Sequence, residues 1–252
     1  MNKKITIVIP TYNEIDNLGL IINKILQIMK INIFNFEIII VDDNSPDGTG
    51  ILADQFSKIY KNIKVIHRKE KTGLGDAYKA GFKEARGDII FEIDCDLSHD
   101  PNDIPRFIKA LKNYDIIIGS RYIKGGSNIN RSIFRILVSK VANILAATFF
   151  KLKLSDCTSG YRAYKKYVID TIISHVNCQK YTFQVEMLEK AKKFGFRIGE
   201  IPIIFRERKR GQSKFNYSEI KEFLKVLFLN FPIIKSYLKL KFDTLSWFEP
   251  YI

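Results

Sequence analysis

The chain has 252 residues, of which 46% are hydrophobic and 27% are charged, a length and composition typical of one globular domain with a substantial buried core. Its 41 basic and 27 acidic side chains give a formal net charge of +14, which favours a polyanionic partner such as nucleic acid, an anionic membrane or a phosphate-bearing substrate. Three scattered cysteines and three scattered histidines exclude a disulfide framework and argue against a His/Cys metal cluster.

The N-terminal apolar run, Ile5–Ile9, is too short for the core of a signal peptide and is better explained as a strand. No run of about 18 or more uncharged apolar residues occurs, so we expect no transmembrane helix. If the protein works at a membrane, we expect it to lie on the surface or to be held there by a partner.

Short β-branched runs alternate with helical patterns over the first half of the chain. The expected strands are Ile5–Ile9, Glu37–Val41, Ile63–His67, Asp88–Ile93 and Ile116–Gly119, and the expected helices are Asp16–Met29, Thr49–Tyr60, Gly75–Ala85 and Asp103–Lys112. The strands are apolar at successive positions, which is typical of a sheet covered on both faces, and the alternation with helices predicts parallel pairing.

The second half is more helical. The expected elements are helices at Ile133–Phe150, Lys166–Ser174 and Phe183–Phe194, a strand at Arg197–Phe205 and a basic loop at Arg206–Lys214. An amphipathic pattern from Ser218 to Phe242 follows, interrupted at Pro232. We therefore predict a catalytic domain over residues 1–215 and an amphipathic helical extension over 216–252, for which core packing and membrane docking remain open.

Polar clusters follow three of the predicted strands. Pro10–Glu14 comes after the first strand, Asp42–Ser45 after the second and Asp94–Asp96 after the fourth. Ligands of parallel sheets bind beyond the carboxyl ends of the strands. The three segments are therefore expected to meet at one edge of the sheet and to form the functional site there.

Asp94 and Asp96 are two residues apart at a predicted strand end, so their carboxylates share one face while Cys95 points the other way. Magnesium and manganese prefer oxygen ligands and keep positions open for phosphate. An acidic turn is the commoner explanation of an isolated Asp-x-Asp, but the neighbouring polar clusters favour a metal site.

Two other segments have both a binding and a structural explanation. Tyr12 offers an aromatic face to a nucleotide base, although a helix N-terminus capped by Asn13 or Asp16 explains the same segment. Asp42 and Asp43 point in different directions, so that one can accept a hydrogen bond from a base or ribose while the other holds the loop.

Eight motifs occur in an order and at a spacing that point to a known family. They are Pro10–Glu14, Val41–Thr49, Gly73–Gly75, Asp94–His99, Gly119–Tyr122, Ser155–Arg162, Gly199–Ile203 and Gly211–Lys214. Together they resemble the family 2 glycosyltransferases and, within them, the polyprenyl-phosphate mannosyltransferase group that includes dolichol-phosphate mannose synthase. The resemblance covers Lys4 to Pro232 and implies a GT-A fold, which is Rossmann-like, with a mixed, mainly parallel sheet, helices on both faces and amphipathic C-terminal helices.

The resemblance also implies roles for individual residues. Asp94 and Asp96 would hold Mg²⁺ or Mn²⁺ and act with Arg121 as catalytic residues, while Arg135 and Ser139 would grip the acceptor phosphate. The residues that would bind the nucleotide sugar are Pro10, Tyr12, Glu14, Val41, Asp43, Asp94, Cys95, Asp96, Arg121, Arg208 and Lys214. The chain departs from the family at Asn44, where a glycine is usual, but asparagine tolerates a left-handed backbone. Cys95 replaces a more usual alanine.

The implied reaction moves mannose from GDP-mannose to dolichyl or polyprenyl monophosphate with inversion, giving the β-linked lipid donor used in glycosylation and in GPI-anchor assembly. The second ionisation of a phosphate monoester lies near pH 6, so the acceptor is already a dianion at about pH 7 and needs no histidine base. Transfer of glucose from UDP-glucose is the alternative within enzymes. A basic nucleic-acid-binding protein is the alternative from another class, but it does not need the acidic site and we expect no nucleic acid as partner.

A lipid acceptor implies work at a membrane surface. We expect the cytosolic face of the endoplasmic reticulum in a eukaryote or the cytoplasmic membrane face in a prokaryote. Some family members carry their own C-terminal membrane helices, which this sequence lacks, so a small membrane subunit is the expected anchor.

Overall fold

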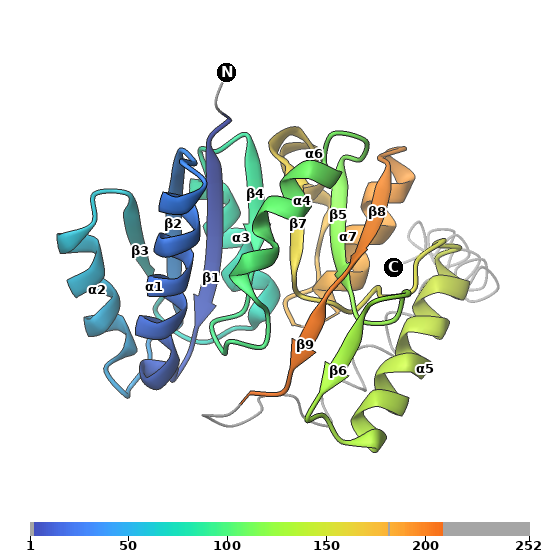
Figure 1. Ribbon diagram of the computed structural model, residues 1–252, viewed down its shortest axis with the longest axis horizontal. Coiled ribbons are helices and arrows are strands. Elements are labelled where there is room, and N and C mark those ends of the chain that lie inside the picture. Colours follow the sequence, from blue (N-terminus) through green and yellow to red (C-terminus); the bar gives the residue numbers. More distant parts are fainter. Residues whose placement is uncertain (1–2, 181, 209–252) are drawn as a thin grey trace, which may run out of the picture.

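Seven strands form the central sheet of the structure, a computed structural model that describes residues 3–180 and 182–208 (Figure 1). They are β1 (Ile5–Thr11), β2 (Phe36–Asp42), β3 (Ile63–His67), β4 (Ile89–Glu92), β5 (Ile116–Ser120), β7 (Arg162–Lys165) and β8 (Ile198–Pro202). Their order across the sheet is β3-β2-β1-β4-β7-β5-β8, and all neighbours are parallel except β7, which runs antiparallel to both β4 and β5. The prediction of a mixed, mainly parallel sheet is confirmed.

Helices cover both faces of this sheet. One face carries α1 (Ile15–Ile31), α2 (Thr49–Ile59), η1 (Pro101–Asp103) and α4 (Ile104–Ala110), and the other carries α3 (Leu74–Glu84), α6 (Lys166–Ile172), η2 (Ile173–His175) and α7 (Phe183–Lys193). Alternate residues of β1 explain the two layers, because Ile7 packs in the cluster that contains Leu18 of α1, whereas Val8 packs in the cluster that contains Tyr78 of α3.

A second, two-stranded sheet lies below the first in Figure 1 and beside α5 (Ile133–Phe149). It pairs β6 (Ser127–Ile129) with β9 (Ile204–Arg206) in parallel. The single strand expected over Arg197–Phe205 is therefore wrong: it is broken at Ile203, which is buried, and whose N–H donates to the carbonyl of Ser120 at 3.0 Å. The chain leaves the large sheet at that residue and enters the small one.

Strand β7 was not predicted, since its sequence begins with arginine at the end of a polar segment. Arg162 is nevertheless fully buried in the middle of the sheet. Its guanidinium donates to the carbonyls of Cys157 and Ser159 at 2.8 Å each and to that of Gln184 at 2.6 Å. These bonds compensate the cost of burying a charge, and they tie the preceding loop to the sheet.

Two further expectations concern the membrane. No helix within residues 3–180 and 182–208 is both long and apolar enough to cross a bilayer. The predicted extension over residues 216–252 lies outside the described residues, as does most of the basic loop.

Candidate active site

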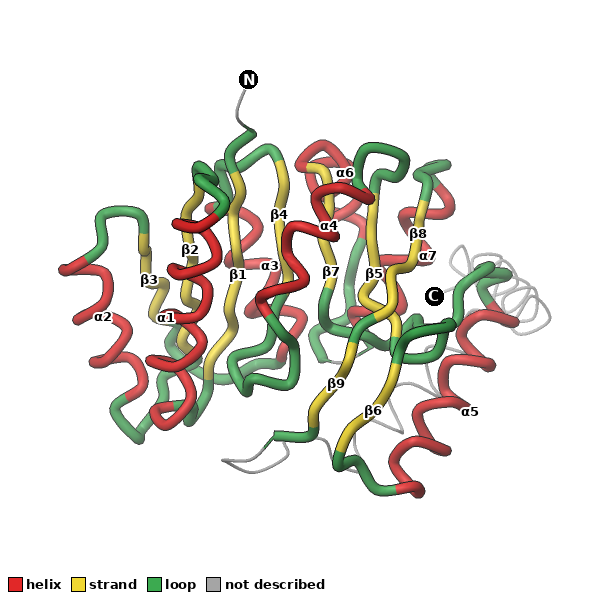
Figure 2. The backbone as a smooth tube through the Cα atoms, viewed as in Figure 1, coloured by secondary structure: helices red, strands yellow, loops and turns green. Residues whose placement is uncertain are grey.

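The carboxyl ends of the parallel strands meet at the lower edge of the sheet in Figure 1, and loops gather below them in Figure 2. Thr11 at the end of β1 pairs with Asp42 at the end of β2, and Asp42 pairs in turn with His67 at the end of β3. The side chain of Arg208 bridges two of the predicted segments, since it lies 2.7 Å from Asp96 and 3.8 Å from Glu14. The structure thus brings the three polar clusters together.

Asp94 and Asp96 follow β4 directly. Asp94 accepts a hydrogen bond from the Tyr78 hydroxyl at 3.2 Å, and burial, reinforced by the Asp96 carboxylate, raises the pKa of Asp94 to about 7. Asp96 accepts from the backbone N–H of Ser98 at 3.0 Å. Leu97, which lies between Asp96 and Ser98, has φ 63°, a left-handed conformation that costs a leucine roughly 1–2 kcal/mol. The backbone is therefore strained directly after the two carboxylates.

These residues fit a divalent cation whose ligands are the two carboxylates together with the oxygens of a diphosphate. The described part of the chain contains no group of three or more His, Cys, Asp or Glu side chains able to enclose a metal, so a cation on Asp94 and Asp96 would take its other ligands from phosphate and water, as magnesium does. Arg208 already supplies a positive charge to Asp96. The negative charge of the acidic pair is thus partly neutralised by an arginine of the protein itself.

His99 lies next to the acidic pair. Its Nδ1 is buried without a hydrogen-bond partner and is 3.9 Å from the Oδ2 of Asp94. Burial lowers the pKa of His99 to about 4, so the imidazole is neutral at pH 7. A Cβ added to Gly160 would lie only 3.2 Å from the same Oδ2. Asp94 thus has a neutral ring and a glycine, which leaves it room, as neighbours.

The residues predicted to bind the nucleoside lie at the ends of β1 and β2, with residues that follow β3 beside them. The ring of Tyr12 has the ammonium of Lys71 4.3 Å from its centroid, and Asp43 accepts a hydrogen bond from Arg68 at 2.8 Å. Burial raises the pKa of Asp43 to about 6, although Arg68 opposes the shift. Asp42 instead accepts from Thr11 at 3.0 Å and from Ser45 at 2.6 Å. Of the two carboxylates, Asp42 holds the loop and Asp43 borders the site.

Other predicted residues contribute less through their side chains. Val41 and Cys95 are buried in opposite core clusters, which leaves only their backbone for a ligand. Pro10 is half-buried within β1. The expectation that Asn13 or Asp16 caps α1 is wrong: the helix begins after Glu14, whose side chain makes no capping bond and accepts from Asn17 at 2.7 Å. Asn13 and Asn44 adopt left-handed φ values of 54° and 58°.

Arg121 follows β5 and is buried. Its Nε and Nη2 donate to the two oxygens of Asp156 at 2.7 Å each, and Nη2 also donates to Thr158 at 2.9 Å. Asp156 is fully buried. The burial of Arg121 leaves no unpaired charge in the interior, because the Asp156 carboxylate keeps the guanidinium ionised and holds it in one orientation.

The residues predicted to grip the acceptor phosphate lie on α5. Arg135 donates to Glu207 at 2.5 Å, and Ser139 is half-buried one turn further along. Arg131 precedes the helix and lies with its guanidinium carbon 5.0 Å from the ring centroid of Phe205. Phe205 also lies 5.5 Å from Arg121 and 5.7 Å from the ring of His99. Lys214 lies outside the described residues.

Four residues of this arrangement had no predicted role: Arg68, Lys71, Asp156 and Phe205. A basic run after the third strand is a sequence signal for Arg68 and Lys71, since that strand ends at the same edge. Asp156 lies in a motif that was noted without a function. Phe205 gave no signal, because its place between His99 and Arg121 depends on the break between β8 and β9.

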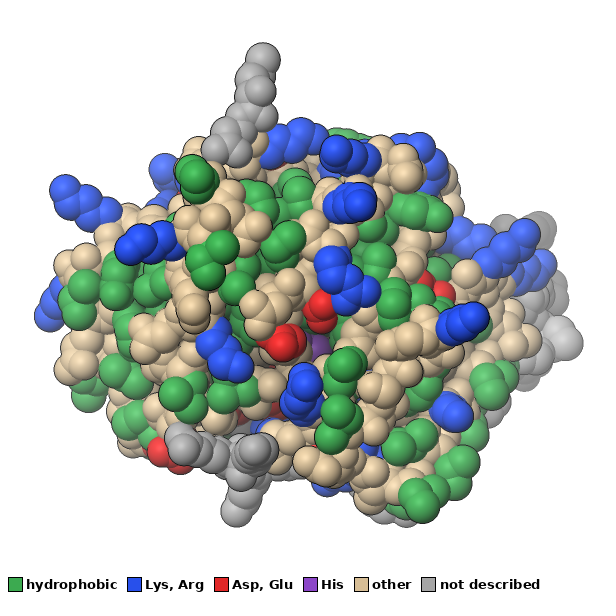
Figure 3. All heavy atoms as spheres, viewed as in Figure 1, with side chains coloured by type: hydrophobic (Ala, Val, Ile, Leu, Met, Phe, Trp, Pro, Cys, Tyr) green, Lys and Arg blue, Asp and Glu red, His purple; other side chains and the backbone are tan. Residues whose placement is uncertain are grey.

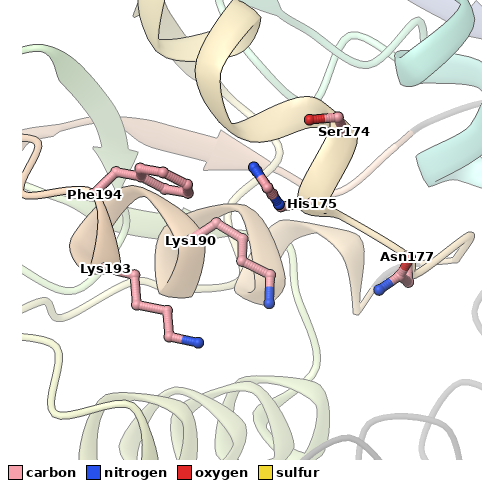
Figure 4. Close-up of a pocket in the computed structure, with 6 residues that line it drawn as sticks. All are labelled: Ser174, His175, Asn177, Lys190, Lys193 and Phe194. Carbon is pink, nitrogen blue, oxygen red and sulfur yellow. The ribbon is translucent and has the colours of Figure 1, made fainter.

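The face shown in Figure 3 has acidic and basic side chains close together near its middle, with histidine between them. A separate cavity of about 480 Å³ lies between η2 and α7 (Figure 4), lined by Ser174, His175, Asn177, Lys190, Lys193 and Phe194. None of these is a predicted site residue, and both lysines pair with Glu189, at 2.9 and 3.5 Å. We assign this cavity no function.

The strand order, the acidic pair after β4 and the buried arginine after β5 are those expected of a glycosyltransferase. The family model described as "Glycosyl transferase family 2" matches residues 6–173, and the chain belongs to that family. The structure has the GT-A fold. It superposes on glucosyl-3-phosphoglycerate synthase from Mycobacterium tuberculosis, solved with Mn²⁺, UDP and glucosyl-3-phosphoglycerate, with a TM-score of 0.66 at 17% identity, covering 90% of this chain and 78% of the other.

Two curated relatives are more similar in sequence. The chain is 37% identical over 217 residues to an undecaprenyl-phosphate mannosyltransferase from Micrococcus luteus, covering 84% of this chain and 88% of the relative. It is 40% identical over 222 residues to a polyprenol monophosphomannose synthase from Mycolicibacterium smegmatis, covering 86% and 82%. The resemblance to polyprenyl-phosphate mannosyltransferases is confirmed.

Proposed function

We propose that this glycosyltransferase moves mannose from GDP-mannose to a polyprenyl monophosphate, with inversion at the anomeric carbon. The observation that carries the proposal is that one edge of the sheet holds the acidic pair, Asp94 and Asp96, together with Tyr12 and Asp43 at the ends of β1 and β2. Arginines lie next to this edge, since Arg121 and Arg131 both contact Phe205, and Arg131 and Arg135 both pair with Glu207. Both curated relatives have polyprenyl-phosphate mannose transfer in their names, which supports the same acceptor class.

On the donor side, Tyr12 and Asp43 bind the base and ribose. Asp94 and Asp96 would hold Mg²⁺ or Mn²⁺, which would supply positive charge to the diphosphate leaving group. The Arg121 guanidinium is fixed by Asp156, so it presents its positive charge without reorganising. Arg208 lies 2.7 Å from Asp96, so it would contact the phosphates of a donor bound at the acidic pair.

On the acceptor side, Arg135 and Ser139 bind the lipid phosphate. An oxygen of that phosphate attacks the anomeric carbon while the bond to the GDP oxygen breaks. No group has to remove a proton from the acceptor, because a phosphate monoester is mostly dianionic at pH 7. Positioning of two anions is the main task of the protein, and fixed arginines suit it.

The acceptor is a lipid, so we propose that the enzyme works at a membrane surface with a separate small subunit as its anchor. Both relatives are bacterial, which favours an undecaprenyl-type chain and the cytoplasmic face of the cell membrane. The endoplasmic-reticulum location and the use of the product in GPI-anchor assembly stay predictions. Co-sedimentation with anionic liposomes tests membrane binding, and failure to sediment both alone and with candidate subunits contradicts it.

The function is tested by transfer of labelled mannose from GDP-mannose to a polyprenyl monophosphate. We expect metal-dependent mannosyl lipid that is lost in Asp96→Ala and in the presence of a chelator. Turnover only with UDP-glucose would replace mannose by glucose in the proposal and keep the acceptor. Silence with both donors would overturn the proposed reaction.

A further inference from the structure

The Gly73–Gly75 motif lies at the start of α3, on the face of the sheet that also carries α7 (Figure 1). The backbone carbonyl of Gln179, before α7, accepts a hydrogen bond from the N–H of Gly75 at 2.6 Å. A Cβ at Gly73 would lie 2.4 Å from that carbonyl oxygen, and one at Gly75 would lie 2.7 Å from the Cβ of Phe183. Only glycine lets the start of α3 approach the start of α7 this closely.

This approach determines where the ring of Tyr78 lies, one turn further along α3. Tyr78 is fully buried. Its ring stacks on that of Phe183, with centroids 6.1 Å apart and an interplanar angle of 8°, and on that of Phe82, with centroids 5.9 Å apart. The ring is thus packed between aromatic side chains of two helices, which restricts where its hydroxyl can point.

The Tyr78 hydroxyl is directed at the acidic pair. It donates to Oδ1 of Asp94 at 3.2 Å. Burial raises the pKa of Tyr78 well above its ordinary value of 10, so the hydroxyl keeps its proton near pH 7 and remains a donor. The Asp94 side chain is 30% exposed, so this carboxylate is accessible to a ligand while the residue that supports it is not.

Asp94 needs a supporting donor because its surroundings disfavour its charge. Burial, followed by the Asp96 and Glu92 carboxylates, raises the pKa of Asp94, and the hydrogen bond from Tyr78 opposes that shift. Residues outside the coordination shell commonly orient the ligands of a metal, and losing one typically weakens metal binding about 10- to 100-fold. Tyr78 has the position and the chemistry of such a residue.

We propose that Tyr78 is a positioning residue of the acidic pair. Its hydrogen bond orients the Asp94 carboxylate for a divalent cation, and the Gly73–Gly75 motif places α3 where that bond can form. Because Tyr78 is fully buried, it acts through Asp94 and does not contact the donor. The inference rests on the proposed function, which assigns a cation to Asp94 and Asp96.

The test is Mn²⁺ binding to the full chain in the presence of GDP, with free Mn²⁺ measured by electron paramagnetic resonance. Tyr78→Phe removes the hydroxyl and keeps the stacked ring, so it is expected to raise the Kd for Mn²⁺ about tenfold. The Kd for GDP in a chelator should not change. Phe183→Leu keeps the hydroxyl but removes the ring stacked on it, and is expected to raise the Kd for Mn²⁺ about threefold.

Tyr164→Phe is the matched control. Tyr164 is also fully buried, but its hydroxyl donates to Glu92 at 3.0 Å and not to the acidic pair. Loss of this hydroxyl is expected to lower the melting temperature at least as much as Tyr78→Phe does, while the Kd for Mn²⁺ stays within about twofold of that of the unaltered chain.

An unchanged Kd for Mn²⁺ in Tyr78→Phe overturns the positioning role, and so does an equal rise in Tyr164→Phe, which would reflect a general loosening of the core. If Tyr78→Phe does not fold, an unchanged Kd in Phe183→Leu overturns it instead. Failure of the proposed function looks different: the unaltered chain would bind Mn²⁺ in a way that depends on Tyr78, yet transfer no mannose. A chain that binds no Mn²⁺ even with GDP overturns both the cation site and the role of Tyr78.

Discussion

The two halves of the molecule differ in how far their charged side chains are buried. One half is built on β1–β4, and the other on β5–β9 with α5. In the first half, Asp43 and Asp96 are nearly buried and already paired with Arg68 and Arg208. In the second half, Arg121 is locked inside the protein by Asp156, but Arg135 is 47% exposed and stands on a helix whose apolar side chains face outward.

This difference matches the chemistry proposed for each half. A small polar donor is recognised by preformed charges in a confined site, where electrostatic interactions are strong. A lipid acceptor has to arrive from a membrane, so the surface that meets it must remain open and apolar. Five predictions, ordered from the largest effect to the smallest, test this difference between the two halves.

Removal of the Asp96 carboxylate should cause the largest loss of activity. Asp96 belongs to the half built on β1–β4, which is proposed to bind the donor and is called the donor half below. Asp96→Ala is expected to lower kcat/KM about a thousandfold, because it removes one of two carboxylates proposed to hold the cation and leaves Arg208 without its 2.7 Å partner. Radiolabelled transfer measures the loss, and circular dichroism checks the fold. Activity within tenfold of the unaltered protein would contradict a cation site at this residue.

Loss of the Asp156 charge should destabilise the second half. Asp156→Asn leaves Arg121 buried beside a neutral partner, which is expected to lower the free energy of unfolding by about 3–5 kcal/mol and to reduce kcat. Denaturant titration measures the stability. Asp170→Asn is the matched control, since Asp170 forms an exposed pair with Lys166 at 2.5 Å and its loss should cost under about 1 kcal/mol. Equal losses in the free energy of unfolding of the two variants would show that the burial of Arg121 does not strengthen the effect of losing its partner.

The pKa of Asp43 gives the donor half a pH signature. If the Asp43 carboxylate accepts a hydrogen bond from the nucleoside, the affinity for GDP should rise as the pH increases through about 6 and level off above it. Asp43→Asn should weaken GDP binding about tenfold above that pH and remove the pH dependence. Calorimetry between pH 5 and pH 8 provides the comparison, and a pH dependence that persists in the variant would assign it to another group.

The same shift predicts an effect on stability with a definite sign. The folded pKa of Asp43, about 6, lies above the ordinary value of 3.8, so the folded state holds the proton more tightly than the unfolded state. The contribution of Asp43 to the free energy of unfolding should therefore decrease as the pH rises from about 4 to 6. Asp43→Asn should flatten that part of the stability profile.

Removal of the exposed Arg135 guanidinium, in the half built on β5–β9 and α5 that is proposed to bind the acceptor, should have the smallest effect. Arg135→Ala is expected to raise the KM for polyprenyl phosphate about fivefold to tenfold, with the KM for the donor unchanged and the free energy of unfolding altered by less than about 1 kcal/mol, since the pair with Glu207 is exposed. Lys58→Ala on α2 is the control for loss of one surface charge. A rise in donor KM instead would move Arg135 into the donor half.

The sequence predicted the parallel core and the first half of the site well. Runs such as Ile5–Ile9 and Glu37–Val41 are buried on both faces of the sheet, and a parallel sheet brings its polar strand ends to one edge, which is why Tyr12, Asp43 and Asp94 could be grouped before their contacts were known. The break at Ile203 was missed because both strands around it read as one apolar run.

What the sequence by itself determined about this protein is the local pattern: strand and helix periodicity, the Asp-x-Asp spacing, the left-handed turn at Asn44 and the motif order of a family 2 glycosyltransferase. Only the tertiary structure decided which charges are paired and which surfaces stay open. Arg162 is polar in sequence yet lies in the core, because three carbonyls from two segments, the loop before β7 and helix α7, accept its hydrogen bonds there. The amphipathic pattern of α5 predicted an apolar face, but its exposure depends on which elements pack against the helix, and periodicity does not contain that information.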